Sequence, residues 1–246
     1  TEISDYEETQ RINDSLVNNF YDTNKDFLSN PNFDTIKFEE IIKRIKQLID
    51  SCKIVDKDYT YLETVMDYTV LEFYTNLKNF KYSFKILDSI GNYPIIRTDK
   101  ILILDWDPKD GSKYRTDKYI RYKGSSGKVY IKEVIGDGTS ENDLSYLYIY
   151  KLKSKLNLYL LIGEGASCMI CQFFAAKVLQ IQGDSLIEYK AFNNESYFEI
   201  DTHEPDSTIF KFNEKSQVLE YKTIKDNEYP SLKGKFIFKS TKFIKE

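Results

Sequence analysis

Apolar side chains change their spacing near Pro94, and this change constrains the fold more than any other feature of the sequence. Before Pro94 they recur every three or four residues, as on one face of an α-helix. After Pro94 they fall in short runs rich in Ile, Val, Tyr and Phe, as in β-strands. We therefore expect an α+β protein, with an N-terminal helical hairpin or bundle at 1–93 followed by an antiparallel β-sandwich or barrel at 94–246.

Helices are expected throughout the N-terminal part. The first ends at Pro31, because the residue before a proline is disfavoured in a helix. The second begins after Asp34 or Thr35, and the third extends from about Tyr59 to Ser89. The residues of the apolar stripe of the third helix are three or four positions apart along its whole length. They are Leu62, Met66, Thr69, Phe73, Leu77, Phe80, Phe84 and Leu87.

Strands separated by Gly, Asp, Asn and Ser turns are expected after Pro94. No helical stripe long enough for a parallel crossover interrupts them, so the sheet should be antiparallel. The predicted core includes Leu62, Phe73, Phe80, Phe84, Leu104, Tyr159 and Val178. The predicted strands lie near 95–98, 101–106, 118–123, 128–135, 145–153, 156–163, 171–182, 185–191, 197–200, 208–212, 217–224 and 233–239.

The charged residues argue against a nucleic-acid partner. The chain has 246 residues, with 35 Lys and Arg against 39 Asp and Glu, for a net charge of −4. Arginine, the usual residue for bidentate phosphate recognition, is scarce, and no segment clusters Lys or Arg with stacking aromatics on one face. No apolar run reaches the length of a membrane span, so we expect no transmembrane segment in this chain.

The segment Cys168-Met-Ile-Cys171 is a CxxC motif, for which the sequence leaves three interpretations open: a redox pair, a disulfide and two reduced thiols. It is at most half of a zinc site, and the sequence has no second cysteine or histidine pair to complete one. A redox role requires a strand-to-helix junction, whereas the surrounding sequence predicts a hairpin. The remaining alternatives are a disulfide between Cys168 and Cys171 and two reduced, packed thiols.

The segment from Asp105 to Gly111 only superficially resembles a calcium loop. An EF-hand requires an oxygen ligand at its fifth position and Glu at its twelfth, where this chain has Lys109 and Thr116. We therefore expect a polar turn, with an irregular cation site as the alternative. The only tryptophan either packs in the core or stacks on a sugar or peptide. Our ligand-binding candidates are Trp106, Tyr114 and Arg115.

The only histidine, His203, lies close to Asp201, which could orient it in a catalytic triad. However, the sequence has no G-x-S-x-G nucleophile elbow, and Gly124-Ser-Ser-Gly127 is predicted to be a turn. We expect a loop histidine. We assign no catalytic, cofactor-binding or metal-ligating residue, predict no cofactor, and expect a protein that is not an enzyme.

Three segments together resemble a family of exported or lipid-anchored proteins of Bacteroidetes-type bacteria. They are Arg97-Thr-Asp-Lys-Ile-Leu-Ile-Leu-Asp-Trp-Asp107, Leu158-Tyr-Leu-Leu-Ile-Gly-Glu-Gly165 and Ala175-Ala-Lys-Val-Leu-Gln-Ile181. The chain has Ile103 where the family pattern favours Arg. The resemblance implies helices before a β domain and a periplasmic or cell-surface location, in which a disulfide is permitted. The family has no assigned activity, so it implies no functional residues.

Three functional hypotheses follow. The first is a non-catalytic binding or interaction module of the bacterial envelope, with an unknown protein or glycan as ligand. The second is a structural or assembly protein that docks through its helical half. The third is a hydrolase of glycans or peptides with an unrecognised pair of carboxylates, one of which would have a raised pKa. The sequence leaves the oligomeric state open.

Overall fold

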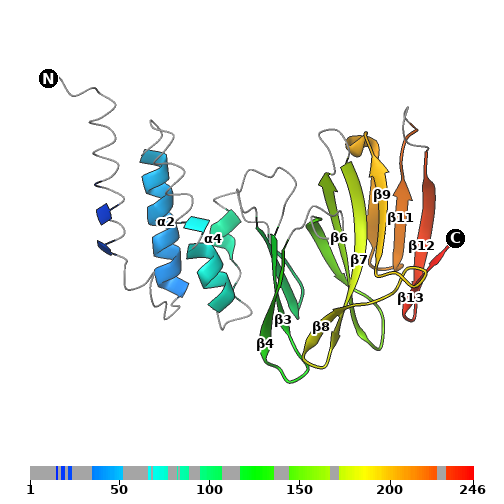
Figure 1. Ribbon diagram of the computed structural model, residues 1–246, viewed down its shortest axis with the longest axis horizontal. Coiled ribbons are helices and arrows are strands. Elements are labelled where there is room, and N and C mark those ends of the chain that lie inside the picture. Colours follow the sequence, from blue (N-terminus) through cyan, green and yellow to red (C-terminus); the bar gives the residue numbers. More distant parts are fainter. Residues whose placement is uncertain are drawn as a thin grey trace. The chain divides into compact units, whose positions relative to one another are not determined.

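The chain forms two compact units, Thr1–Asn92 and Tyr93–Glu246, drawn in Figure 1. The computed structural model describes residues 15, 18–19, 22–23, 35–51, 66–67, 69–76, 82, 84–88, 95–106, 117–135, 144–166, 172–225 and 231–246.

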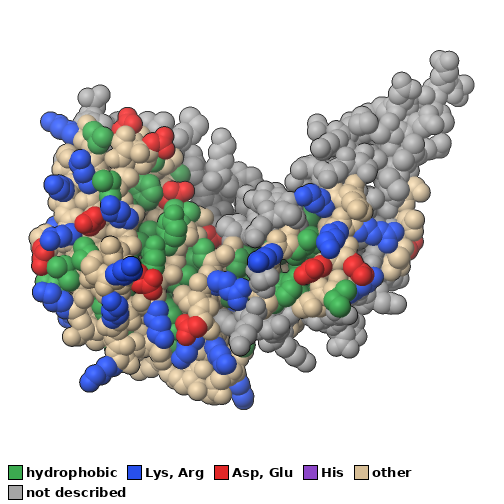
Figure 2. Space-filling model, turned by 180° about the vertical axis from the view of Figure 1, so that it is seen from behind, with side chains coloured by type: hydrophobic (Ala, Val, Ile, Leu, Met, Phe, Trp, Pro, Cys, Tyr) green, Lys and Arg blue, Asp and Glu red, His purple; other side chains and the backbone are tan. Residues whose placement is uncertain are grey.

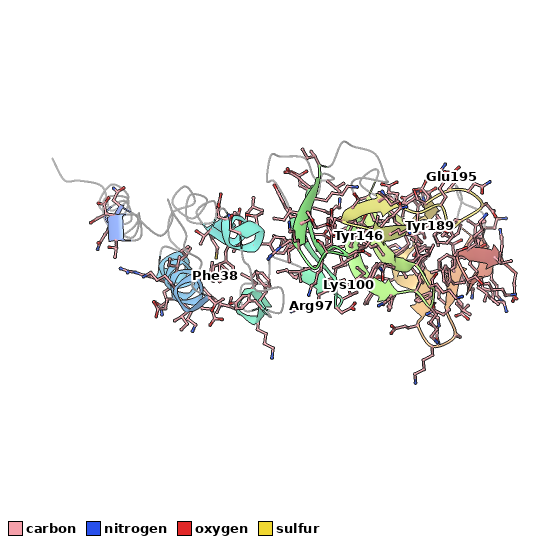
Figure 3. All side chains as sticks on the ribbon, turned by 90° about the horizontal axis from the view of Figure 1, so that it is seen from below. Phe38, Arg97, Lys100, Tyr146, Tyr189 and Glu195 are labelled. Carbon is pink, nitrogen blue, oxygen red and sulfur yellow. The ribbon has the colours of Figure 1, made fainter. Side chains whose placement is uncertain are left out.

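Helix α2 (Thr35–Ser51) supplies much of the described core of the first unit. Its buried face follows helical spacing and consists of Phe38, Ile41, Ile42 and Ile45. Phe38, labelled in Figure 3, stacks on Phe73 with ring centroids 3.6 Å apart. Phe73 belongs to a helical segment at 69–76, and the short helix α4 (Lys85–Asp88) follows.

The prediction of an N-terminal helical bundle is wrong. The described residues are mainly antiparallel sheet, 53% of them in strands, and contain only short helices. The helix expected from 59 to 89 is interrupted, because Phe84 has a φ of 56°, in the left-handed region that an α-helix excludes. Apolar spacing shows which side chains share a buried face, but it does not require one unbroken helix to carry them.

Other predictions for the first unit have mixed outcomes. Phe73 and Phe84 are buried, as expected of core residues. Leu62 and Phe80 lie outside the described residues, as does the helix expected before Pro31 apart from residues 15, 18–19 and 22–23.

The second unit contains three antiparallel sheets. Sheet A has the order β1 (Ile95–Arg97), β2 (Ile101–Trp106), β3 (Asp117–Lys123) and β4 (Val129–Val134). Sheet B has the order β5 (Ser145–Lys151), β6 (Asn157–Ala166), β7 (Gln172–Gln182) and β8 (Ser185–Glu188), with β9 (Tyr197–Thr202) also pairing with β7. After the 3-10 helix η1 (Pro205–Ser207), sheet C has the order β10 (Ile209–Asn213), β11 (Val218–Lys222), β12 (Lys233–Lys239) and β13 (Lys242–Lys245).

The strand predictions agree closely with these boundaries, and the antiparallel pairing is confirmed. The exception is β13, which the sequence analysis missed. Lys239 pairs with Lys242, so only Ser240 and Thr241 connect β12 to β13. Ser240 adopts a φ of 61°, a conformation normally signalled by Gly or Asn, so the turn lacks the usual sequence mark.

Sheet B lies between the other two sheets and is buried on both faces. Leu161 and Ala175 belong to a cluster shared with sheet A, whereas Leu160 and Val178 belong to a cluster shared with sheet C. A sheet covered on both faces needs apolar residues at successive positions, which explains the uninterrupted run at 158–162. This packing agrees with the predicted β-sandwich character, and Leu104, Tyr159 and Val178 are buried as expected.

Candidate functional site

The outer face of sheet C is rich in lysine. Along β12, the side chains of Phe236 and Phe238 are buried, whereas Lys233, Lys235 and Lys239 are exposed. This alternation follows from the pleat of a strand, which places successive side chains on opposite faces. Figure 2 shows lysine and arginine side chains spread over the face of the β-rich unit that it draws, with hydrophobic side chains among them.

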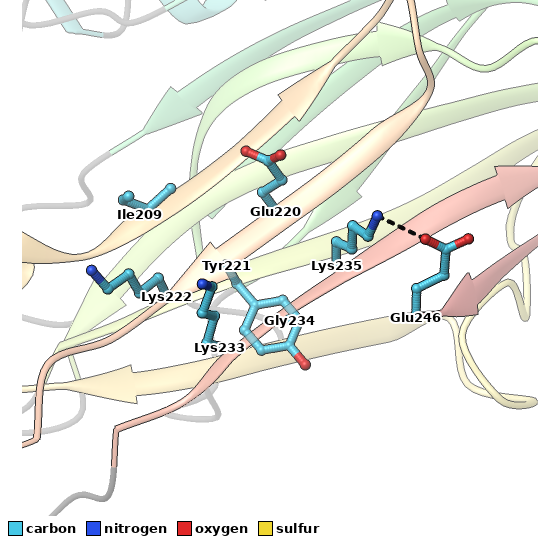
Figure 4. A pocket seen from close by; sticks show the side chains of 8 residues that line it. All are labelled: Ile209, Glu220, Tyr221, Lys222, Lys233, Gly234, Lys235 and Glu246. Atoms are coloured by element: carbon cyan, nitrogen blue, oxygen red, sulfur yellow. Dashed lines mark ion pairs between the residues drawn. The ribbon is translucent and has the colours of Figure 1, made fainter.

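A hollow of about 450 Å³ lies on this outer face. Two rows of side chains cross the strands on either side of it. In the first row, Lys222 lies opposite both Ile209 and Lys233 in the sheet register; in the second, Glu220 lies opposite Lys235. The residues lining the hollow, drawn in Figure 4, are Ile209, Glu220, Tyr221, Lys222, Lys233, Gly234, Lys235 and Glu246.

Tyr221 and Gly234 lie between the two rows, where the floor of the hollow is backbone. Tyr221 is buried, and its ring lies against Gly234 on the inner face, where a Cβ on Gly234 would collide with it. In Figure 4 the Tyr221 ring points away from the side on which Lys222 and Glu220 stand. The hollow therefore forms because Gly234 has no side chain and Tyr221 points inward, whereas the residues on either side of them point outward.

Lys222 and Lys233 form a pair of like charges directly opposite each other on neighbouring strands. Both side chains are exposed, and neither makes an ion pair or side-chain hydrogen bond with any residue that the structure describes. Like charges in directly opposed positions destabilise a sheet. This first row of the hollow therefore carries two positive charges that no described acid offsets.

The second row is neutralised internally. Lys235 Nζ lies 2.8 Å from a carboxylate oxygen of Glu246, and Lys211 Nζ lies 3.5 Å from one of Glu220. The hydrogen bond from Lys235 lowers the pKa of Glu246, and the same bond raises the pKa of Lys235. Both partners therefore remain charged at neutral pH, and the net positive charge of the hollow comes from the first row.

A second polar cluster is buried between sheets A and B. Asp105 and Lys118 lie opposite each other on β2 and β3, with relative exposures of 5% and 0%. Asp105 Oδ2 accepts hydrogen bonds from Ser145 Oγ at 2.9 Å and from the backbone N–H of Tyr146 at 2.7 Å. Burial raises the pKa of Asp105 to about 6, although Lys118 and these two hydrogen bonds act to lower it.

A carboxyl with a raised pKa is what a general acid needs, but the surroundings of Asp105 do not suit catalysis. The other buried acid nearby, Asp117, belongs to the opposite face of sheet A. It directly precedes Lys118 on β3, and successive side chains of a strand point to opposite faces. The two carboxyls therefore do not converge on one site. Asp105 instead accepts a hydrogen bond from the backbone N–H of Tyr146, on an edge strand of sheet B.

Among the described residues that line the hollow, none was singled out from the sequence. Trp106 ends β2, and its side chain is outside the described part of the structure. Tyr114, Arg115, Cys168 and Cys171 also lie outside the described residues, so the predicted ligand contacts and disulfide stay predictions. The described histidine, His203, lies in a bend after β9 and is partly buried.

Sequence reasoning missed the lysines of sheet C, although a signal was present. The run Lys233-Gly-Lys-Phe-Ile-Phe-Lys239 places lysine at alternate positions, so a strand there must expose its cations on one face. The pairing of Lys222 with Lys233 could not have been found in this way, since it depends on the register between two strands.

The described residues include neither a metal site nor a membrane-spanning helix. Among the residues with a described position, no group of three or more His, Cys, Asp or Glu side chains could hold a metal ion. No helix in the described part of the chain is long and apolar enough to cross a membrane. No family model, curated protein or solved structure matches the chain. The resemblance to exported proteins therefore stays a prediction.

Proposed function

We propose that the protein is a non-catalytic binding module of the bacterial envelope that holds an acidic glycan in the hollow on the outer face of sheet C. The observation that carries this proposal is the opposed pair Lys222 and Lys233 beside a hollow of about 450 Å³. The envelope location rests on the resemblance to exported proteins alone.

Electrostatics favours an anionic ligand. A carboxylate or sulfate group placed between Lys222 and Lys233 would accept a charge-assisted hydrogen bond from each ammonium group. It would also offset the repulsion between the two lysines, which the free protein must tolerate. Ile209, 39% exposed at the end of the same row, offers an apolar contact to the body of the ligand.

The carboxylates of the hollow support binding rather than hydrolysis. A glycosidase requires one carboxyl with a raised pKa to act as general acid. Here Glu220 and Glu246 each form an ion pair with a lysine, and the pKa of Glu246 is lowered by its partner. The Glu246 carboxylate, held in its charged form by Lys235, cannot donate a proton to a leaving group near neutral pH.

The proposal can be tested by calorimetric titration with trigalacturonate, using the neutral sugar maltotriose as a ligand control. We expect wild-type protein to bind the acidic trisaccharide and not the neutral one. The double variant Lys222→Ala/Lys233→Ala should bind at least tenfold more weakly. A matched variant, Lys155→Ala/Lys190→Ala, removes the same charge from exposed positions outside sheet C and should bind like wild type.

Two results would contradict the proposal. One is equal binding of the acidic and neutral trisaccharides, which would mean that charge does not select the ligand. The other is an equal loss of binding in both double variants, which would mean that net charge matters and the hollow does not. Circular dichroism of each variant would establish that its fold is retained.

A further inference from the structure

The cations of sheet C continue beyond the hollow along β12. Lys233, Lys235 and Lys239 all project from the outer face of this strand. At the far end, Lys239 lies directly opposite Lys242 on β13, so the sheet has a second pair of opposed lysines. We call Lys222 and Lys233 the first rung and Lys239 and Lys242 the second rung.

We propose that sheet C binds a linear acidic polysaccharide whose chain runs along β12 from the first rung to the second. This inference rests on the proposed function, and it adds the length of the ligand and a second point of contact. The rungs are separated by six residues of β12, which corresponds to about 20 Å in a β-strand. The ligand must therefore be an oligomer long enough to span that distance.

The distribution of charge supports a polyanionic ligand. Six lysines and two glutamates project from the outer face of sheet C, a net charge of +4, although the whole chain has a net charge of −4. Between the rungs, β12 contributes Lys235 and the partly buried Ile237. A chain lying along β12 would thus meet cations at both ends and an apolar side chain in the middle.

The chemistry of this face favours a polysaccharide over a nucleic acid. Single-stranded nucleic acids are bound by basic grooves that also carry aromatic side chains for base stacking. All the aromatic residues in the strands of sheet C belong to its inner face, where Phe212, Tyr221 and Phe236 are buried. The outer face therefore offers charge without a stacking platform, which suits a polymer without bases.

The position of the acids favours a single polymer chain over a membrane. Glu220 and Glu246 flank Lys235 on the neighbouring strand and at the chain terminus. A flat anionic surface would be pressed against both carboxylates, whereas one chain following β12 can pass between them.

Two contacts on one ligand strengthen binding through effective concentration. Once the first rung holds a polymer, the second rung meets another part of the same molecule without a separate encounter. Exposed charge pairs are individually weak, so losing the second rung should weaken the binding of a long chain by about fivefold. A chain too short to reach the second rung should lose nothing.

The test compares trigalacturonate, which is shorter than the distance between the two rungs, with a galacturonate dodecamer, which is longer. We expect wild-type protein to bind the dodecamer more tightly than the trimer at equal concentration of sugar units. Lys239→Ala/Lys242→Ala should weaken dodecamer binding about fivefold and leave trimer binding unchanged. Lys155→Ala/Lys190→Ala serves as the charge-matched control for both ligands.

Failure of this inference is distinguishable from failure of the proposed function. Suppose that Lys239→Ala/Lys242→Ala binds both oligomers like wild type while Lys222→Ala/Lys233→Ala binds neither. The hollow is then a binding site, but the second rung does not contact the ligand. Tighter binding of single-stranded oligonucleotides or of vesicles containing anionic lipid than of the dodecamer, at equal charge and salt, would overturn the assignment to a polysaccharide.

Discussion

The hydroxyl of Tyr130 donates a 2.8 Å hydrogen bond to Asp184 Oδ2, across 54 residues of sequence. Tyr130 belongs to β4 in sheet A, and Asp184 forms the turn between β7 and β8 in sheet B. The backbone N–H of Ser126 donates to the other carboxylate oxygen at 2.9 Å, and the Tyr122 hydroxyl donates to the Asp184 carbonyl at 3.0 Å. One aspartate therefore joins the ends of two hairpins in adjacent layers.

Replacing Tyr130 with Phe should change the titration of Asp184. The hydrogen bonds from the backbone of Ser126 and from Tyr130 lower the pKa of this carboxyl. Without the hydroxyl, that pKa should move up toward its ordinary value, while the phenylalanine ring keeps its stacking on Tyr122. Carbon-detected NMR titration of the carboxyl would measure the change. An unchanged pKa would show that the Tyr130 hydrogen bond is not formed in solution.

Gly163→Ala should destabilise the protein by about 3 kcal/mol, at the upper end of the cost of overpacking. A Cβ at this position would lie 2.9 Å from the backbone carbonyl carbon of Ser145 and 2.9 Å from Leu144 Cγ, so strand β5 would have to move. Gly183→Ala provides a control. There a Cβ meets nothing within 4 Å and only the φ of 61° is unfavourable. Its cost should be about 1 kcal/mol.

Urea unfolding of both glycine variants would measure these differences. Equal losses of stability would contradict the close approach of β5 to β6 at Gly163.

The buried carboxyl of Asp105 should make stability depend on pH. Its pKa rises from 3.8 to about 6 on folding, because burial disfavours the charged form. A group with a raised folded pKa stabilises the native state most when protonated, so this contribution is present below pH 3.8 and is lost as the pH rises through 6. The difference between the two pKa values corresponds to about 3 kcal/mol.

Asp105→Asn removes this titration and keeps an acceptor for Ser145 and Tyr146. The stability of the variant relative to wild type should therefore increase between pH 4 and pH 7, by about 2 kcal/mol, because part of the contribution is already lost at pH 4. Urea unfolding at the two pH values would give the difference directly. A relative stability that does not change with pH would mean that Asp105 titrates as an ordinary exposed acid.

Breaking the ion pair between Lys177 and Glu188 should also cost stability. Lys177 is buried, and its Nζ lies 2.6 Å from Glu188 Oε1. Burial acts to raise the pKa of Glu188, but the hydrogen bond and charge of Lys177 outweigh it and the pKa is lowered. The carboxylate therefore stabilises the fold above its ordinary pKa of 4.5, and this effect is lost as the pH falls through the lower folded value.

Glu188→Gln should lower the free energy of unfolding by about 1–2 kcal/mol at pH 7, less than for a fully buried pair because Glu188 is partly exposed. Ser196→Ala removes only the 3.1 Å hydrogen bond to Glu188 and should cost less. Adding Lys177→Met to the glutamine variant should restore stability, since the buried ammonium group is then absent. A double variant no more stable than Glu188→Gln would show that Lys177 does not depend on this partner.

The candidate site shows how far sequence reasoning can reach. The strand containing Lys233 and Lys235, and the alternation of its side chains, were predictable from local pattern. Rare residues, such as Trp106 and His203, limit the possible chemistry most strongly and are therefore the more obvious candidates in a sequence. Lysine is common in this chain, so a lysine can be assigned to a binding site only when its neighbours across the sheet are known.

By itself, the sequence determined the described strands other than β13, most of their turns and the antiparallel pairing, because these depend on neighbours within a few residues. Tertiary structure alone decided three things: the break in the expected helix at Phe84, the burial of sheet B on both faces, and the opposition of Lys222 to Lys233. The physical reason is that register and layer order are set by packing between segments far apart in the chain. A slip of one residue would turn every side chain of a strand to the other face.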